Sequence, residues 1–322
     1  MRHLVANLRA HVRRRAGGVV IDATLNSISR AGRLHPNSLA IQRGVDVIRD
    51  VPYLPSGDRW HRLDVYRPTD HPGPHPVLFY VHGGGFRILS KDTHWMMGLQ
   101  FARRGFTVFS INYRLAPASP YPAALQDAFA AAAFVRDHAA DYGADPSRFV
   151  LAGESAGGNI VCAMTAAHCY RRPEPWARAF YDLNLPIEAV MPAAGLLQVT
   201  DPDRFRRRRP DLPAWLMDRI TEVSEGYLHK AGDAPLADPL LIFEAGAPPE
   251  RPIPPMLATA GTRDPILDDT RRLGPAIERL GGTCDVRIYP GGAHAFHAVF
   301  WRDLARQCWA DHFAFLDRHV PR

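Results

Sequence analysis

Short apolar segments alternate with helix-length segments along most of this chain, from residue 76 to the C-terminus. The continuously apolar segments span residues 77–81, 106–111, 149–152, 187–192, 256–260 and 286–289. The predicted helices between and after them span about residues 93–104, 123–142, 156–171, 269–280 and 299–319. Buried strands that alternate with helices of this length are typical of βαβ units, whose right-handed crossovers cover both faces of a parallel sheet. The sequence therefore predicts an α/β fold with a mostly parallel central sheet.

The N-terminal part of the chain does not follow this alternation. Residues 1–45 have the pattern of one or two helices with polar interruptions. Residues 60–67 alternate between apolar and polar side chains, which predicts a half-buried strand. We assign residues 46–322 to one catalytic domain because single α/β domains of this size are common.

A long stretch also interrupts the alternation between the apolar segments at 187–192 and 256–260. It exceeds 60 residues, which is too long for a plain connection between a helix and a strand. It contains a helix-like segment at 214–228. We therefore expect an inserted element over about residues 200–240, and a lid over the active site is its natural role.

The charge of the chain limits the kinds of partner to consider. A net charge of +6 and an isoelectric point near 9.3 are compatible with an anionic partner. No signature of a nucleic-acid-binding module is present, so no nucleic-acid partner is expected. No run of 18 apolar residues occurs, so no transmembrane segment is expected. Peripheral contact with lipid and assembly into a homo-oligomer stay open.

The cysteines and the N-terminus indicate the compartment. None of the four cysteines forms a CxxC pair, which argues against a zinc site or a redox dithiol and favours reduced thiols. No apolar segment of signal-peptide length follows the N-terminal arginines. We therefore expect a cytoplasmic protein without a metal site.

The first motif that indicates chemistry is Gly-Glu-Ser-Ala-Gly at residues 153–157, a GxSxG sequence. It follows a predicted strand and begins a predicted helix, which is the context of a nucleophile elbow centred on Ser155. The glycines stand where a side chain would collide with the sharply turning backbone. Ala156 begins the helix, so its N–H group can stabilise a developing oxyanion.

The second motif is His-Gly-Gly-Gly-Phe at residues 82–86, directly after the strand at 77–81. Glycines without Cβ atoms let backbone N–H groups turn inward, so Gly83 and Gly84 are candidate oxyanion donors beside Ala156. We expect the ring of His82 to support the loop and to take no part in proton transfer.

The acid and the base of a catalytic triad should follow later strands, in the chain order serine, acid, histidine. Asp264 follows the strand at 256–260 and is the candidate acid, whereas Asp268 and Asp269 stand where the next helix begins. His294 follows two glycines after the last strand and is the candidate base. We expect His297 to begin the last helix or to lie on its surface. All these motifs fall at the carboxyl ends of predicted parallel strands, where open α/β sheets bind ligands.

These motifs resemble the hormone-sensitive lipase family of α/β-hydrolases, which includes many bacterial esterases. The matching segments are 82–86, 112–117, 121–124, 153–159, 264–267 and 294–296. The resemblance implies an α/β-hydrolase fold with a helical cap built from residues 1–45 and about 200–240. It also implies Ser155 as nucleophile with Asp264 and His294 as its partners, the three oxyanion donors named above, and no cofactor. Asn112 and Ala118 depart from the family pattern, which more often has acidic residues at these positions.

The expected function is hydrolysis of short- to medium-chain acyl esters through an acyl-enzyme, with a small-molecule ester as substrate. Two other functions stay open from the sequence: an amidase or peptidase with the same triad, and a non-catalytic small-molecule receptor on the same fold. Phe86 and Trp215 are candidate substrate-binding residues. The arginines at 204 and 206–209 are expected in a solvated loop of the cap, where contact with anionic lipid is an alternative.

Overall fold

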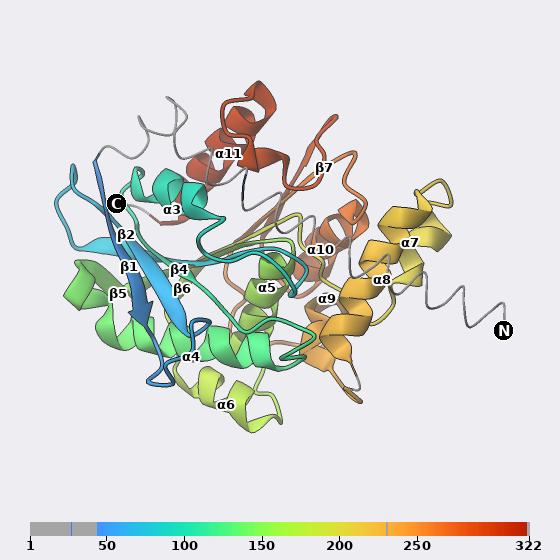
Figure 1. Ribbon diagram of the computed structural model, residues 1–322, viewed down its shortest axis with the longest axis horizontal. Helices are drawn as coiled ribbons and strands as arrows, with labels where there is room; N and C mark the ends of the chain where they lie inside the picture. Colours follow the sequence, from blue (N-terminus) through green and yellow to red (C-terminus); the bar gives the residue numbers. More distant parts are fainter. Residues whose placement is uncertain (1–26, 28–43, 230, 321–322) are drawn as a thin grey trace.

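An eight-stranded sheet forms the centre of the computed structural model, which describes residues 27, 44–229 and 231–320 (Figure 1). The strand order is β1-β2-β4-β3-β5-β6-β7-β8. The strands are β1 Val45–Pro52, β2 Arg62–Pro68, β3 His75–Val81, β4 Thr107–Ile111, β5 Ala144–Glu154, β6 Ile187–Ala193, β7 Met256–Gly261 and β8 Cys284–Tyr289. The pairs β1–β2 and β2–β4 are antiparallel and the other neighbours are parallel, which confirms the predicted sheet. The predicted N-terminal helical segment lies outside the described residues.

Helices cover both faces of this sheet. The longer ones are α3 Trp95–Ala102, α4 Ala123–His138, α5 Ala156–Cys169, α6 Pro175–Asp182, α8 Ala214–Leu228, α10 Leu267–Arg279 and α11 Asp303–His319. The short ones are α7 Asp203–Arg208 and α9 Pro239–Glu244, with single 3₁₀ turns at Ala139–Tyr142, Pro235–Ala237 and Phe296–Ala298. The sequence patterns predicted five of these helices within a few residues of their ends, together with the helix-like segment that forms α8.

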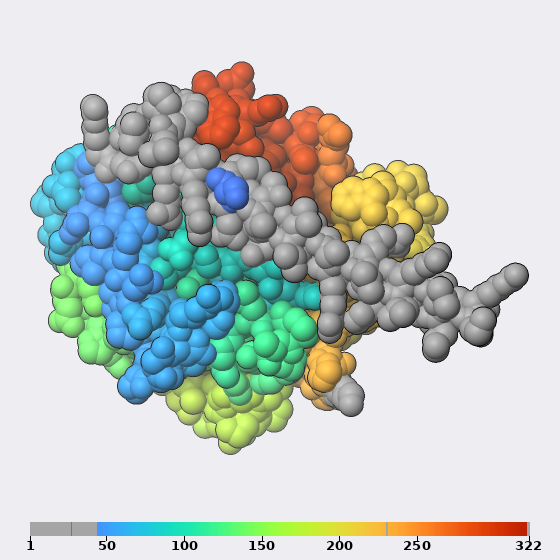
Figure 2. Space-filling model, viewed as in Figure 1, coloured from blue at the N-terminus to red at the C-terminus, as the bar shows by residue number. Residues whose placement is uncertain are grey.

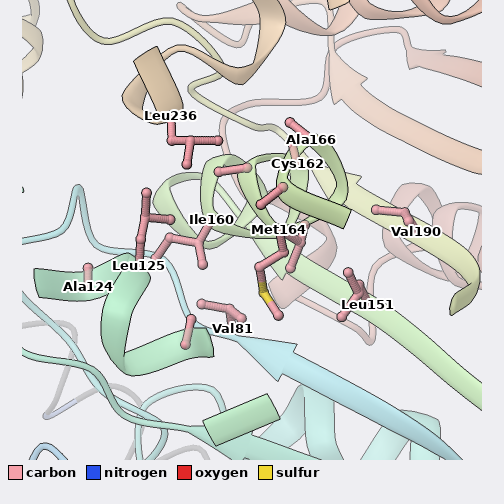
Figure 3. Packing of buried hydrophobic residues seen from close by; sticks show 14 of the residues in the cluster. Val81, Ala124, Leu125, Leu151, Ile160, Cys162, Met164, Ala166, Val190 and Leu236 are labelled. Carbon is pink, nitrogen blue, oxygen red and sulfur yellow. The ribbon is translucent and has the colours of Figure 1, made fainter. Parts of the chain in front are cut away.

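The hydrophobic core divides into two clusters, one on each face of the sheet. One cluster packs α3 and α11 against the strands, and the larger one packs α4, α5, α6, α9 and α10 against the opposite face. At the centre of the larger cluster, α5 carries Ile160 and Met164 toward Val81 and Leu151 on the strands (Figure 3). Every residue of α5 is buried, so its position on the sheet is strongly determined. The beginning of α5 therefore provides a rigid support for the residue that precedes it.

Strand β2 is more buried than its sequence indicates. The alternation at residues 60–67 predicts one solvated face, but Asp64 is fully buried and Tyr66 nearly so. The reason is that β2 lies between β1 and β4, that α3 packs on it, and that Lys91 binds the Asp64 carboxylate at 2.8 Å. The prediction that one face of this strand is solvated is therefore wrong, because the charged side chain of Asp64 is paired inside the molecule.

The long insertion between β6 and β7 forms the compact helices α7, α8 and α9. In Figure 2 the yellow segment that includes α7 projects from the body of the molecule. Within residues 44–229 and 231–320, no helix combines the length and the apolar composition that a membrane crossing requires.

Candidate active site

Ser155 occupies the sharp turn between β5 and α5, at the carboxyl edge of the sheet. Its backbone has φ 55° and ψ −112°, a strained conformation for a residue with a side chain. A Cβ atom at Gly157 would lie 2.1 Å from the carbonyl oxygen of Val81, and one at Gly153 would lie 2.5 Å from that of Gly157. Both glycines of the GxSxG sequence are therefore needed for the close packing of this turn, as the sequence predicts.

The imidazole of His294 lies between Ser155 and Asp264. Its Nε2 atom is 3.1 Å from the Ser155 hydroxyl oxygen, and its Nδ1 atom is 3.0 Å from a carboxylate oxygen of Asp264. The other carboxylate oxygen of Asp264 accepts a hydrogen bond of 3.0 Å from the amide of Ile266. The structure thus brings together three side chains that are far apart in the chain: Ser155 precedes His294 by 139 residues, and Asp264 precedes it by 30.

The loops that carry Asp264 and His294 are held together by backbone contacts. A Cβ atom at Gly261 would lie 2.0 Å from the carbonyl oxygen of Gly292, so these two glycines permit a very close approach. The amide of Arg263 donates a hydrogen bond of 2.9 Å to the same carbonyl. Because β7 and β8 are neighbouring parallel strands, their following loops meet at one edge of the sheet.

The charge of Asp264 controls the protonation of His294. Burial lowers the pKa of the imidazole, but the attraction and the hydrogen bond of the Asp264 carboxylate outweigh burial and raise this pKa to about 9. Asp264 is itself fully buried, so its charge is little screened by solvent. The geometry permits His294 to accept a proton from Ser155 and then to be stabilised as an imidazolium.

The glycine-rich loop after β3 lies directly against the elbow. A Cβ atom at Gly83 would be 3.4 Å from the Cβ of Ser155. In this structure the amide of Gly83 donates a hydrogen bond of 3.3 Å to Nε2 of His94. The Gly83 amide is one of the three predicted oxyanion donors. Its hydrogen bond to His94 must therefore break before this amide can bind a ligand oxygen.

The other two predicted donors have backbone environments that suit the role. Gly84 has φ 109°, and a Cβ atom there would lie 2.1 Å from the carbonyl oxygen of Ile88, so only glycine fits. Ala156 is the first residue of α5, and its N–H group therefore has no partner within that helix. The N-terminal end of α5 also carries the partial positive charge of the helix dipole.

Glu154 forms a second acid–histidine group behind Ser155. Its buried carboxylate lies 3.2 Å from Nε2 of His297 and 3.7 Å from Nε2 of His94. Burial raises the pKa of Glu154, but the interactions with these two histidines hold it well below its ordinary value. The prediction that His297 lies on the surface or begins the last helix is wrong: it is buried in a 3₁₀ turn, and α11 begins only at Asp303.

His82 supports the glycine-rich loop, in agreement with the expectation from the sequence. Its ring stacks on Tyr113 with a centroid separation of 4.2 Å, and its Nδ1 atom lies 2.7 Å from the carbonyl oxygen of Gly83. Burial is the main reason that its pKa falls to about 3, so the ring is neutral at physiological pH.

Phe86 does not line an open substrate site, which corrects the prediction made for it. Its side chain is fully buried and stacks on the ring of Tyr227 in α8, with a centroid separation of 3.7 Å. Next to it, Arg87 forms an ion pair of 2.7 Å with Glu222, also in α8. The insertion is thus packed onto the glycine-rich loop, and Phe86 is part of that packing. Trp215, at the start of α8, is 64% exposed and is the other predicted substrate residue.

We expect the substitution Phe86→Ala to destabilise the protein by about 3 kcal/mol, because it removes a buried aromatic ring and leaves a cavity. Urea unfolding monitored by circular dichroism measures this change. Trp215→Ala is the matched control and should change the free energy of unfolding by less than about 1 kcal/mol, since its ring is mostly exposed. Equal effects of the two substitutions would contradict the packing role of Phe86.

The arginine cluster forms a helix and not the predicted loop, although Arg206, Arg207 and Arg208 are exposed to solvent as expected. Arg204, Arg206, Arg207 and Arg208 belong to α7, and the side chain of Arg204 is buried. Its guanidinium binds the carboxylate of Asp269 at 2.6 Å. Asp269 does lie in the first turn of α10 as predicted, but it is buried and accepts backbone hydrogen bonds from the segment after β6.

A second hydrogen-bonded group of a serine, a histidine and an aspartate is separate from the candidate triad. The Ser56 hydroxyl is 2.6 Å from Nδ1 of His61, whose Nε2 is 3.2 Å from the carboxylate of Asp127. Arg114 also binds both oxygens of that carboxylate. No motif of the sequence marks this group, because its members lie in ordinary turns and helices.

Known proteins resemble the chain in both sequence and structure. A family model described as the alpha/beta hydrolase fold matches residues 78–298. Esterase LipI of Mycobacterium tuberculosis is 32% identical over 250 residues, which cover 76% of this chain and 72% of that protein. An acetyl esterase of Salmonella paratyphi A is 30% identical over 247 residues, which cover 75% and 70% of the two chains. The crystal structure of esterase LipW from Mycobacterium marinum superposes with a TM-score of 0.77 at 25% identity and covers 95% of this chain and 90% of that one.

The family match covers the glycine-rich loop, the nucleophile elbow and the loops that carry Asp264 and His294. The sheet order and the helices on both faces agree with that fold. The chain therefore belongs to the hormone-sensitive lipase family of α/β-hydrolase esterases.

Proposed function

We propose that the protein hydrolyses carboxylic esters of short- to medium-chain acids through a covalent acyl-enzyme on Ser155. The observation that carries this proposal is the position of the His294 imidazole, within hydrogen-bond distance of both Ser155 and Asp264. A hydroxyl, an imidazole and a buried carboxylate in this order are the requirements for an activated serine nucleophile.

In the acylation step, His294 takes the proton of the Ser155 hydroxyl as the oxygen attacks the ester carbonyl. The carbonyl oxygen becomes an oxyanion, which the amides of Ala156, Gly84 and Gly83 stabilise once Gly83 has released His94. His294 then gives its proton to the departing alkoxide, and the alcohol leaves. Asp264 stabilises the imidazolium and holds the ring in the correct tautomer.

In the deacylation step, a water molecule replaces the alcohol. His294 takes a proton from this water, and the resulting hydroxide attacks the acyl carbon. The tetrahedral intermediate collapses, Ser155 regains its proton from His294, and the carboxylic acid leaves. Each half of the cycle therefore consists of one proton transfer to the His294 imidazole and one from it.

Two features support an ester with a small acyl group as the substrate. The relatives of this chain include proteins named acetyl esterase. In addition, the insertion packs its α8 helix directly on the glycine-rich loop through Phe86 and Tyr227. Because these two rings fill the space where α8 meets the loop, we expect a short acyl chain to be preferred over a long one.

A series of p-nitrophenyl esters from acetyl to dodecanoyl tests this function. We expect kcat/KM to be highest for acetyl or butyryl esters and to fall by at least about tenfold toward dodecanoyl, because one methylene of misfit is worth about 1–3 kcal/mol. The matched p-nitroanilides test for an amidase, and a triglyceride emulsion tests for a lipase. Faster hydrolysis of the anilides, or no turnover of any ester, would overturn the proposal.

A further inference from the structure

A pocket of about 320 Å³ lies between α7, α10 and the segment that follows β6. Four arginines line it: Arg204, Arg207, Arg208 and Arg272. Gln198 and Asp201 supply the other polar side chains of the wall. The family motifs contain none of these residues, so the motifs assign no role to the pocket.

The two inner arginines form a rigid wall. Arg204 is 5% exposed and is held by Asp269 at 2.6 Å. Arg272 binds both oxygens of Glu244, at 2.9 and 2.6 Å, and donates a hydrogen bond of 2.8 Å to the side chain of Gln198. Their guanidinium groups are thus fixed before any ligand arrives, which lowers the entropic cost of binding.

The two outer arginines, Arg207 and Arg208, are more exposed and are held less tightly. The side chain of Arg207 is 62% exposed and that of Arg208 is 44% exposed. Among the described residues, Arg207 pairs with Asp201 and Arg208 pairs with Asp268 at 3.4 Å, one contact each. A guanidinium has five N–H donors, so most of the donors of these two side chains are not used by these contacts. Exposed ion pairs of this kind contribute little to stability and are readily exchanged for a ligand.

We propose that this arginine pocket binds an oxyanion, that is, a carboxylate or phosphate group of a small molecule. The planar fork of arginine matches both groups in a bidentate manner, which the point charge of lysine does not. Asp201 is the single carboxylate among the described residues that line the pocket, and it competes with the ligand for Arg207. The net charge of +6 also favours anions over cations around this protein.

The pocket is linked to the active site by a short segment of backbone. The amide of Leu196 donates a hydrogen bond of 3.2 Å to the carbonyl oxygen of Ser155. The amides of Leu197 and Gln198 donate to the Asp269 carboxylate that also holds Arg204. As a second part of the inference, we take the acidic group of an ester substrate as one source of the oxyanion that the arginines bind. This second part of the inference rests on the proposed function, whereas anion binding itself does not.

Isothermal titration with inorganic phosphate, at constant ionic strength kept with sodium chloride, tests the pocket directly. We expect the double substitution Arg207→Gln and Arg208→Gln to weaken phosphate binding at least about fivefold. Arg206→Gln is the matched control, because Arg206 is an exposed arginine of the same helix that does not line the pocket. Asp201→Asn should strengthen binding about threefold, since it removes the competing carboxylate, and misfolding cannot produce such a gain.

A second measurement distinguishes a free anion from an acidic group of the substrate. The p-nitrophenyl half-ester of succinic acid is compared with the neutral butyryl ester, in the wild-type protein and in the same variants. A rise in KM for the half-ester alone in the double variant indicates a substrate group, and phosphate binding without such a rise indicates a free anion. Phosphate binding that is absent, or equal in the double variant and the Arg206→Gln control, would overturn the proposal.

Discussion

The substitution Ser155→Ala is expected to lower kcat for p-nitrophenyl acetate by about 10⁴- to 10⁶-fold and to abolish the initial burst of p-nitrophenol. Without the hydroxyl, no acyl-enzyme forms, and only the oxyanion donors and substrate binding remain to accelerate attack by water. Stopped-flow absorbance measures the burst, and steady-state turnover measures the residual rate. Retention of near-full turnover would contradict the role of Ser155.

The chain supplies a matched control for this experiment. Ser56→Ala removes a hydroxyl that also lies beside a histidine and an aspartate. We expect kcat to be unchanged, because Arg114 already neutralises the Asp127 carboxylate and Ser56 does not lie at the nucleophile elbow. A loss of activity equal to that of Ser155→Ala would show that the wrong serine has been assigned.

The substitution Asp264→Asn is expected to lower kcat by about 10⁴-fold, because the amide favours the wrong tautomer of His294 and cannot stabilise its imidazolium. It should also change the dependence of the rate on pH. His294 must be neutral to act as a base, and its pKa is raised to about 9 because the Asp264 carboxylate outweighs burial. In the wild-type protein, kcat/KM should therefore rise about tenfold per pH unit below about 9 and then level off.

The Asn variant removes the cause of this shift. With the carboxylate gone, the attraction and the hydrogen bond that raise the pKa of His294 are lost, so the rising limb of the residual activity should move to lower pH. Asp268→Asn, in the first turn of α10, is the control and should leave both kcat and the pH profile unchanged. An unshifted profile in the Asp264→Asn variant would contradict the coupling of these two side chains.

The local sequence is enough to predict the central sheet and the position of the proposed nucleophile, Ser155. Short continuous apolar segments that alternate with helix-length segments are typical of strands covered on both faces. The glycines around Ser155 are required by contacts within a few residues or with the neighbouring strand. Chain order and strand ends then single out Asp264 and His294, because the carboxyl ends of parallel strands meet at one edge. Each of these inferences depends on backbone geometry, which short patterns determine well.

Side-chain partnerships across the fold could not be predicted in this way. Phe86 resembles a substrate contact in the sequence, yet its ring stacks on Tyr227, some 140 residues later. His297 has the pattern of a surface residue, yet it pairs with Glu154 inside the molecule. Whether an apolar ring or a charge is buried depends on which distant element packs against it, and no local pattern records that neighbour.

The sequence by itself determined the alternation of strands and helices and the edge of the sheet at which the candidate active site lies, because these follow from local burial periodicity and from backbone space at glycines. Only the tertiary structure decided that the insertion packs on the glycine-rich loop, that Arg204 is buried against Asp269, and that the amide of Gly83 binds His94. These contacts join residues that are far apart in the chain, and their free energy exists only once the sheet has brought their elements together.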